Sequence, residues 1–289
     1  MKWLNRNDDE SNYEDRRGRS TGGKIALGGG LGTIIVLALY LFTGQDFSGV
    51  VNMFNGGGNQ SMEQTVDPAR AKENEDLKVF SLGVFNSAND VWTKIFNEQF
   101  GQEYRKPTFV TFTDVTQSEC GGASGATGPF YCPADEKVYI DLAFFHELAS
   151  RFNAPGDLAM AYVTAHEVGH HVQKLLGITD KMQQLRGRMS EEEYNQLSVR
   201  LELQADFYAG LWARNAEKMG IIQLEQGDIE SALGAANAVG DDTIQKQAQG
   251  YVVPDAFTHG TSAQRMRWFM KGYQTGDIRQ GDTFNASSL

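Results

Sequence analysis

His166 and His170 are separated by one helical turn, and Glu167 follows the first histidine in the run His-Glu-Val-Gly-His. In a helix of about 3.6 residues per turn, two imidazoles at this spacing lie on one face and can bind a single zinc ion. The carboxylate of Glu167 lies one step around the helix, where it can accept a proton from a water that the metal activates. This combination of residues predicts hydrolysis of peptide bonds.

The flanking sequence predicts the required helix independently of the motif. Pro155-Gly156-Asp157 is typical of a helix start, with Asp157 as the cap, and Gly177 is typical of a helix end. We expect His171 to point away from the ligand face, as a surface residue or a partner of a ligand. The alternative is that the histidines are ordinary core residues of an amphipathic helix. The apolar positions between the two ends have helical spacing: Leu158, Tyr162, Ala165, Val168 and Val172.

A catalytic zinc needs a third protein ligand, and the helical pattern over residues 194–219 offers one. Glu202 and Asp206 are four residues apart and share a face of that helix. If this face lies against the first helix, Glu202 can bind the metal while Asp206 accepts the spare ring N–H of a ligating histidine. Small residues such as Ala205 and Gly210 would let the two helices approach closely. The alternative is a solvated helix that bears acids.

Together these motifs resemble the gluzincin class of zinc peptidases, in which two histidines and a glutamate hold the metal. Over most of its length the chain resembles more closely the bacterial family of membrane-anchored neutral zinc metallopeptidases. The resemblance implies a zincin-like peptidase domain with His166, His170 and Glu202 as ligands of Zn²⁺. Besides the two helices, it is carried by Phe130-Tyr131-Cys132-Pro133, by Tyr139-Ile140-Asp141 and by the run from Phe257 to Arg265.

The C-terminal run also contains candidate catalytic side chains. The transition state of amide hydrolysis develops an oxyanion, and His259 could donate a hydrogen bond to it. Arg265, on a helix expected over residues 262–271, could pair with Asp206 or another acid and hold the site together. His259 could instead be an ordinary residue at the entry of this helix. The run is similar to the His-Pro-x-x-x-x-Arg ending of membrane-associated gluzincins, except that Gly260 replaces the proline.

Two segments alternate in the manner of β-strands, residues 108–112 and residues 137–141. An extended peptide can add to an exposed sheet edge through main-chain hydrogen bonds, and residues 137–141 are the candidate for that edge. The alternative is that both strands are plain core elements. Cys120 and Cys132 flank a glycine-rich loop. A disulfide between them would stabilise the fold by about 3 kcal/mol in an oxidising compartment.

Residues 25–43 carry no charge and are long enough to cross a bilayer. Basic residues precede this segment and none follows it until Arg70. The positive-inside rule therefore predicts a signal anchor in the bacterial inner membrane, with a cytoplasmic N-terminus and a periplasmic body. The formal net charge of -11 and the absence of a basic run argue against a nucleic-acid partner.

These observations predict a disordered cytoplasmic tail over residues 1–24, a flexible linker over residues 44–75 and one α+β, predominantly helical peptidase domain over residues 76–289. In the domain we also expect helices at residues 87–100, 228–238 and 241–249. The expected partners are a peptide or protein substrate and the membrane. Two other functions are compatible with the same residues, namely a membrane-tethered zinc-containing scaffold without catalysis and a zinc amidase acting on cell-wall peptides. The oligomeric state cannot be inferred from the sequence.

Overall fold

The computed structural model describes residues 1–18, 68–150, 152 and 154–289. Over these residues the protein is mostly helical with small β-sheets, consistent with the expected α+β class. The α-helices are α3 (Pro68–Ile95), α4 (Ala143–Ser150), α5 (Asp157–Leu175), α6 (Ile178–Leu185), α7 (Glu191–Lys218), α8 (Asp228–Ala238), α9 (Asp241–Gln249) and α10 (Ser262–Thr275). The remaining helical turns are the π-helix η1 (Phe96–Phe100) and the 3-10 turns η2 (Gly125–Thr127), η3 (Pro254–Ala256) and η4 (Ile278–Gln280).

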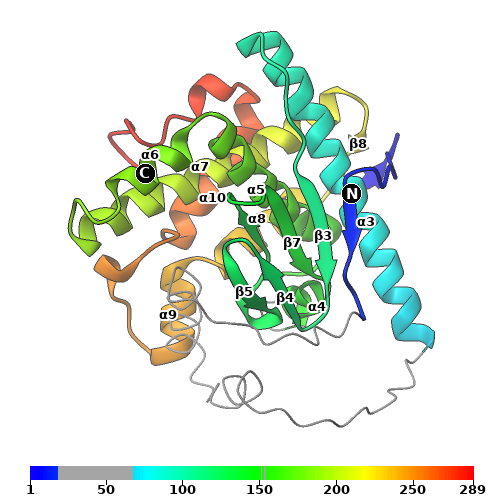
Figure 1. The fold of residues 1–289 in the computed structure, drawn as a ribbon, viewed down its shortest axis with the longest axis horizontal. Coiled ribbons are helices and arrows are strands. Elements are labelled where there is room, and N and C mark those ends of the chain that lie inside the picture. The colour runs from blue at the N-terminus through cyan, green and yellow to red at the C-terminus, as the bar shows by residue number, and fades with distance from the viewer. Residues whose placement is uncertain (19–67, 151, 153) are drawn as a thin grey trace.

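The main sheet has the strand order β2 (Tyr13–Asp15), β3 (Thr108–Phe112), β7 (Lys137–Asp141) and β6 (Phe130–Cys132). β2 and β7 are parallel to β3, and β6 runs antiparallel to β7. The prediction of residues 137–141 as the edge strand is wrong, because β6 pairs with their outer side. Figure 1 shows these strands near the centre of the view, with α3 along one side and α5, α7 and α10 gathered on the other.

The two faces of the sheet are covered differently. Phe109, Val138 and Ile140 are fully buried in the large core that the helices form. The alternate residues Val110 and Tyr139 point to the other face, where they join a small cluster with the disulfide. The alternation of the two predicted strands therefore places apolar side chains on both faces, and each face is buried.

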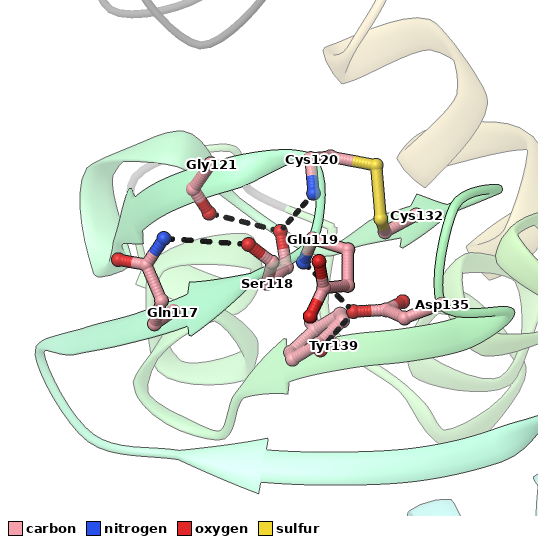
Figure 2. Close-up of a disulfide and its surroundings, with 8 residues drawn as sticks. All are labelled: Gln117, Ser118, Glu119, Cys120, Gly121, Cys132, Asp135 and Tyr139. Atoms are coloured by element: carbon pink, nitrogen blue, oxygen red, sulfur yellow. Dashed lines mark hydrogen bonds between the residues drawn. A yellow bond between two sulfur atoms is a disulfide. The ribbon is translucent and has the colours of Figure 1, made fainter. Parts of the chain in front are cut away.

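A hairpin of β4 (Val115–Ser118) and β5 (Gly121–Ser124) lies next to the small cluster. Cys120, in the turn of this hairpin, forms the expected disulfide with Cys132 at the end of β6 (Figure 2). Asp135 accepts hydrogen bonds from the backbone N–H of Glu119 and from the hydroxyl of Tyr139. The hairpin is thus attached to the edge of the main sheet by a covalent bond and by a shared carboxylate.

Residues 1–18 are part of the folded body, so the prediction of a disordered tail is wrong for them. β2 extends the main sheet, and β1 (Lys2–Trp3) pairs with β8 (Ile222–Gln223). The side-chain amide of Asn86, on α3, donates to the backbone carbonyls of Asn7 and Asp9. In Figure 1 this N-terminal segment, in blue, lies between α3 and β3.

The same contacts explain why α3 is longer than predicted. The sequence predicts a linker up to residue 75 and a helix from Ser87, whereas α3 begins at Pro68. Two side chains of its first half pair with the N-terminal segment: Glu75 with Arg17, and Lys78 with Glu10. Because these partners are distant in sequence, the local pattern gives no sign of them.

No helix within the described ranges is long and apolar enough to cross a membrane. The predicted anchor at residues 25–43 lies outside these ranges. Most of the predicted linker, residues 44–67, also lies outside them.

α7 and α10 cross with their backbones in contact. A methyl group at Gly210 would lie 2.0 Å from the carbonyl oxygen of Phe269, and one at Gly272 would lie 2.0 Å from that of Phe207. Gly210 therefore serves the packing of α7 on α10, and not the approach of α7 to α5 that the sequence suggests. This crossing fixes α10, which carries Arg265, against the helix that carries Glu202 and Asp206.

Candidate metal centre

α5 presents both histidines of the motif on one face. The ring centroids of His166 and His170 are 4.8 Å apart. The helix starts after Gly156, whose φ of 118° lies in the region that favours glycine. The prediction of Asp157 as the cap is wrong, because it is the first helical residue and Gly156 occupies the cap position. Gly177, with φ of 74°, follows the helix end as expected.

α7 brings Glu202 to the two histidines. Its carboxylate oxygens lie 3.1 Å from Nε2 of His166 and 3.5 Å from Nε2 of His170. The residue that caps the start of α7 is Ser190, which forms a reciprocal capping box with Glu193. Glu202 therefore faces α5, and the alternative of a solvated acidic face does not apply to it.

Small residues bring the two helices together at the site. A methyl group built on Gly169, between the two histidines, would lie 3.3 Å from the Cα atom of Ala205. Ala205 is fully buried beside Asp206. The predicted close approach of α5 and α7 thus takes place at Ala205, where it brings Glu202 and Asp206 up to the histidine face.

Asp206 contacts Nδ1 of His166, the ring nitrogen that does not face Glu202. Its Oδ1 accepts from Nδ1 of His166 at 2.9 Å, and its two oxygens accept from Arg265 at 2.8 and 2.9 Å. The hydroxyl of Tyr162 also donates to it. Asp206 is fully buried, so these donors compensate for the loss of water around its charge. Asp206 and Arg265 are therefore in contact with each other, as the sequence predicts. Asp206 also contacts His166, one of the candidate metal ligands.

The charges of the candidate metal ligands and of Asp206 shift one another's pKa values. Although burial opposes it, attraction to Glu202 raises the pKa of His170 to about 9. Burial likewise opposes the charge of Glu202, and the two histidines hold its pKa well below the usual range. Burial also disfavours the charge of Asp206, but Arg265 outweighs it and lowers the pKa of Asp206 to about 2. Glu202 and Asp206 are therefore held in the ionised form, and their negative charges attract protons or a metal ion.

Glu167 lies beside the ligand pair on α5. It is buried, with 8% of its surface exposed, and its charge acts on His170. Its carboxylate has no hydrogen-bond partner in the part of the chain that the structure describes. It is therefore free to exchange a proton with a small molecule at the site.

His259 lies in the loop before α10, near enough for its charge to act on Glu202. Its Nδ1 lies 3.2 Å from the buried carboxylate of Asp241, which also accepts from the backbone N–H groups of residues 258, 259 and 260. Desolvation opposes the charge of His259, and Asp241 raises its pKa. Sequence reasoning missed Asp241, which gives no signal beyond its place in the first turn of a predicted helix.

His171 does not lie at the surface, as one of the two sequence-based interpretations has it. It is fully buried, and its ring nitrogens face the hydroxyl of Tyr131 at 2.9 Å and the carbonyl oxygen of Arg105 at 2.6 Å. Burial lowers the pKa of His171 to about 4. A neutral ring accepts from Tyr131 and donates to Arg105, and so attaches the edge strand β6 to α5.

The three donors fit a zinc ion. One ligand atom from each of His166, His170 and Glu202 can be chosen so that all lie within 4.8 Å of one another. The Nδ1 atoms of both histidines have other partners, Asp206 and Gln173, so the Nε2 atoms are left for a metal. Two imidazoles and a carboxylate are a donor set that catalytic zinc uses. His146 lies apart, with Nδ1 3.6 Å from Glu73.

Comparison with known proteins agrees with this geometry. The family described as "Putative neutral zinc metallopeptidase" matches residues 1–284. The chain belongs to this family. Its relatives include the "Uncharacterized protein YpfJ" of Escherichia coli K12, which is 44% identical over 295 residues, or 99% of this chain and 100% of that protein.

A second relative in this family is the "Uncharacterized protein Rv2575" of Mycobacterium tuberculosis H37Rv. It is 44% identical over 214 residues, which cover 71% of this chain and 69% of that protein. No solved structure is significantly similar to this chain. The family resemblance inferred from the motifs is therefore confirmed.

Proposed function

We propose that this protein is a zinc-dependent peptidase with a zincin-like site of the gluzincin type. The observation that supports it is the convergence of His166, His170 and Glu202, from two helices, with Glu167 beside them and unpaired. Donor sets of this composition hold zinc in hydrolases. Zinc would supply a positive charge that polarises the scissile carbonyl and makes water more acidic.

The chain's own residues supply the proton transfers. Glu167 takes the proton of the attacking water and returns it to the leaving amine, for which its unpaired carboxylate is available. His259, oriented through Nδ1 by Asp241, keeps its Nε2 for a hydrogen bond to the oxygen that becomes negatively charged. Asp206, Arg265 and Tyr162 take no part in proton transfer but hold the ring of His166.

We further propose that the substrate chain binds at β6 in an extended conformation. β6 is the edge of the main sheet within the described residues, and Tyr131 attaches it to α5 through His171. An extended peptide that adds to this edge through main-chain hydrogen bonds would run alongside the helix that carries Glu167. Recognition through the backbone would make binding tolerant of the substrate sequence.

The test is an assay of the purified full chain on a broad peptide library, with and without a metal chelator. Glu167→Gln keeps the size of the side chain but removes its basicity, so kcat falls by about 10²–10⁴-fold while zinc content is unchanged. Exposed Glu147 on α4 offers a matched control, and Glu147→Gln is expected to leave kcat unchanged. Cleavage by Glu167→Gln at the unmodified rate would contradict the proposal.

A further inference from the structure

Gln173 is a fully buried amide one helical turn beyond His170. Its Oε1 lies 2.8 Å from Nδ1 of His170. Its Nε2 donates to the carbonyl oxygen of Leu201 at 2.7 Å and to Oε1 of Gln204 at 3.1 Å. Every polar group of this side chain is therefore satisfied by a specific partner on α5 or α7.

The orientation of the amide is fixed by backbone groups that can only accept. The carbonyl oxygen of Gly281 accepts from Nε2 of Gln204 at 3.0 Å, so Oε1 of Gln204 faces Gln173. That oxygen and the carbonyl oxygen of Leu201 both require a donor, which must be Nε2 of Gln173. The atom that Gln173 turns toward His170 is consequently its oxygen.

An amide oxygen accepts hydrogen bonds and cannot donate them. Nδ1 of His170 must then carry a hydrogen, and in the neutral ring Nε2 keeps the lone pair that a metal requires. Nε2 is also the atom that faces Glu202, at 3.5 Å. The chain of amides from Gly281 thus selects the tautomer of His170 that is competent to bind a metal.

The two histidine ligands are held by partners of different charge. His166 is held by Asp206, an anion whose charge Arg265 balances, whereas His170 is held by a neutral amide. A second carboxylate at this position would add an uncompensated negative charge beside Glu202. A glutamine supplies the acceptor without that charge.

We propose that Gln173 is a positioning residue for His170, and that Gln204 and the backbone of Gly281 hold Gln173 in the orientation that this role requires. The inference rests on the proposed zinc site. It predicts that the C-terminal segment around Gly281, although it touches no ligand, contributes to metal affinity through this chain of hydrogen bonds.

The test is the zinc dissociation constant of Gln173→Met, measured by competition with a chromophoric chelator. Methionine has a similar length but offers His170 no comparable acceptor, so zinc binding is expected to weaken by about 10–100-fold. Gln245 is a matched control, because it is buried on α9 and accepts from the backbone N–H of Val253. Gln245→Met is expected to leave zinc affinity unchanged.

Gln173→Glu separates positioning from packing. It keeps an oxygen acceptor for His170 but turns its second oxygen toward the acceptors of Leu201 and Gln204, so it is expected to lower the stability of the fold. Zinc binding should nevertheless weaken less than in Gln173→Met, whereas a purely structural role would make the loss of zinc affinity follow the loss of stability. Gln204→Met serves as a second variant if Gln173→Met does not fold, and is expected to weaken zinc binding less, since Leu201 still accepts from Gln173. Unchanged affinity in the folded variants would overturn the inference. A parent protein that binds no zinc would instead refute the proposed function.

Discussion

At the scale of residues, the site depends on buried carboxylates whose charges are fully partnered. Asp206 has His166, Arg265 and Tyr162 as donors, and Asp241 has His259 and three backbone N–H groups. If a buried carboxylate loses such donors, nothing offsets the free energy of removing its charge from water, and the fold is destabilised. These two acids therefore couple the stability of the fold to the geometry of the site.

The pair of Asp241 and His259 predicts a pH-dependent contribution to stability. Burial opposes the charge of Asp241, yet its partners lower its pKa below 3.8, so its stabilisation is present above that pH and is lost as pH falls through the folded value. His259 has a pKa raised above 6.5, so its stabilisation is present below that pH and is lost as pH rises through the folded value.

Asp241→Asn should therefore lower the free energy of unfolding by about 1–3 kcal/mol. The loss should be larger at about pH 5, where both partners are charged, than at about pH 8. Denaturant unfolding of the parent and the variant at both pH values measures the difference. An identical loss at the two pH values would show that the charge of His259 contributes nothing.

The residues that could be predicted from the sequence are those related to the motif by helical spacing. His166, Glu167 and His170 lie on one helix, and the spacing of Glu202 and Asp206 fixes their common face. Asp241 could not be predicted, because only the tertiary fold places it against the loop at residues 258–260. Gln173 could not be predicted either, since the carbonyl of Leu201 and the amide of Gln204, which fix its orientation, lie on another helix.

At the scale of elements, the metal centre requires three helices in fixed contact. α5 and α7 meet at Gly169 and Ala205, and α7 meets α10 at Gly210 and Gly272. The second crossing leaves no room for side chains, because each glycine faces a backbone carbonyl of the other helix. The position of Arg265 relative to Asp206 therefore depends on two glycines that do not touch the site.

We expect Gly272→Ala to destabilise the fold by about 1–3 kcal/mol or more, because the helices must separate to admit a methyl group. The separation should also weaken zinc binding, since Arg265 moves with α10. Gly234→Ala on α8 is the matched control, because the added methyl group would lie at an ordinary contact distance of 3.9 Å from Cβ of Ala154 and alanine favours a helix. Thermal unfolding and zinc titration of both variants test this. Equal stability of Gly272→Ala and the parent would contradict the observed crossing.

Single elements proved more predictable than the way in which strands pair, and the strands predicted at residues 108–112 and 137–141 agree with β3 and β7. The helices at residues 228–238 and 241–249 agree with α8 and α9, since capping and periodicity act locally. The sheet edge was predicted wrongly because β6 has three residues and strand order depends on distant pairings. The early start of α3 was missed for the same reason, as its first half is stabilised by residues 10 and 17.

At the scale of the whole molecule, the N-terminal segment (residues 1–18) and the body of the protein form one unit. The basic residues before residues 25–43 predict one membrane crossing, with the two parts on opposite sides. Parts on opposite sides of a bilayer cannot pair as β2 and β3 do. We therefore propose that residues 1–18 share a compartment with the body, and the disulfide favours an oxidising one.

Cysteine labelling in intact cells tests this proposal. Asp8 and Glu103 are exposed, one in the N-terminal segment and one in the body. Asp8→Cys and Glu103→Cys are expected to react alike with a membrane-impermeant maleimide, because the two positions lie in one compartment. The native cysteines give no background labelling, because both are in the disulfide. Labelling of one position and protection of the other would support the single crossing instead.

We propose that His166, His170 and Glu202 together bind one zinc ion. X-ray absorption at the zinc edge, on the purified full chain, tests it most directly. We predict one zinc per chain with two imidazole nitrogens and carboxylate oxygen at about 2.0–2.2 Å, and loss of that signal in Glu202→Ala and His166→Ala. Zinc bound with sulfur ligands, or an unchanged signal in both variants, would contradict the account.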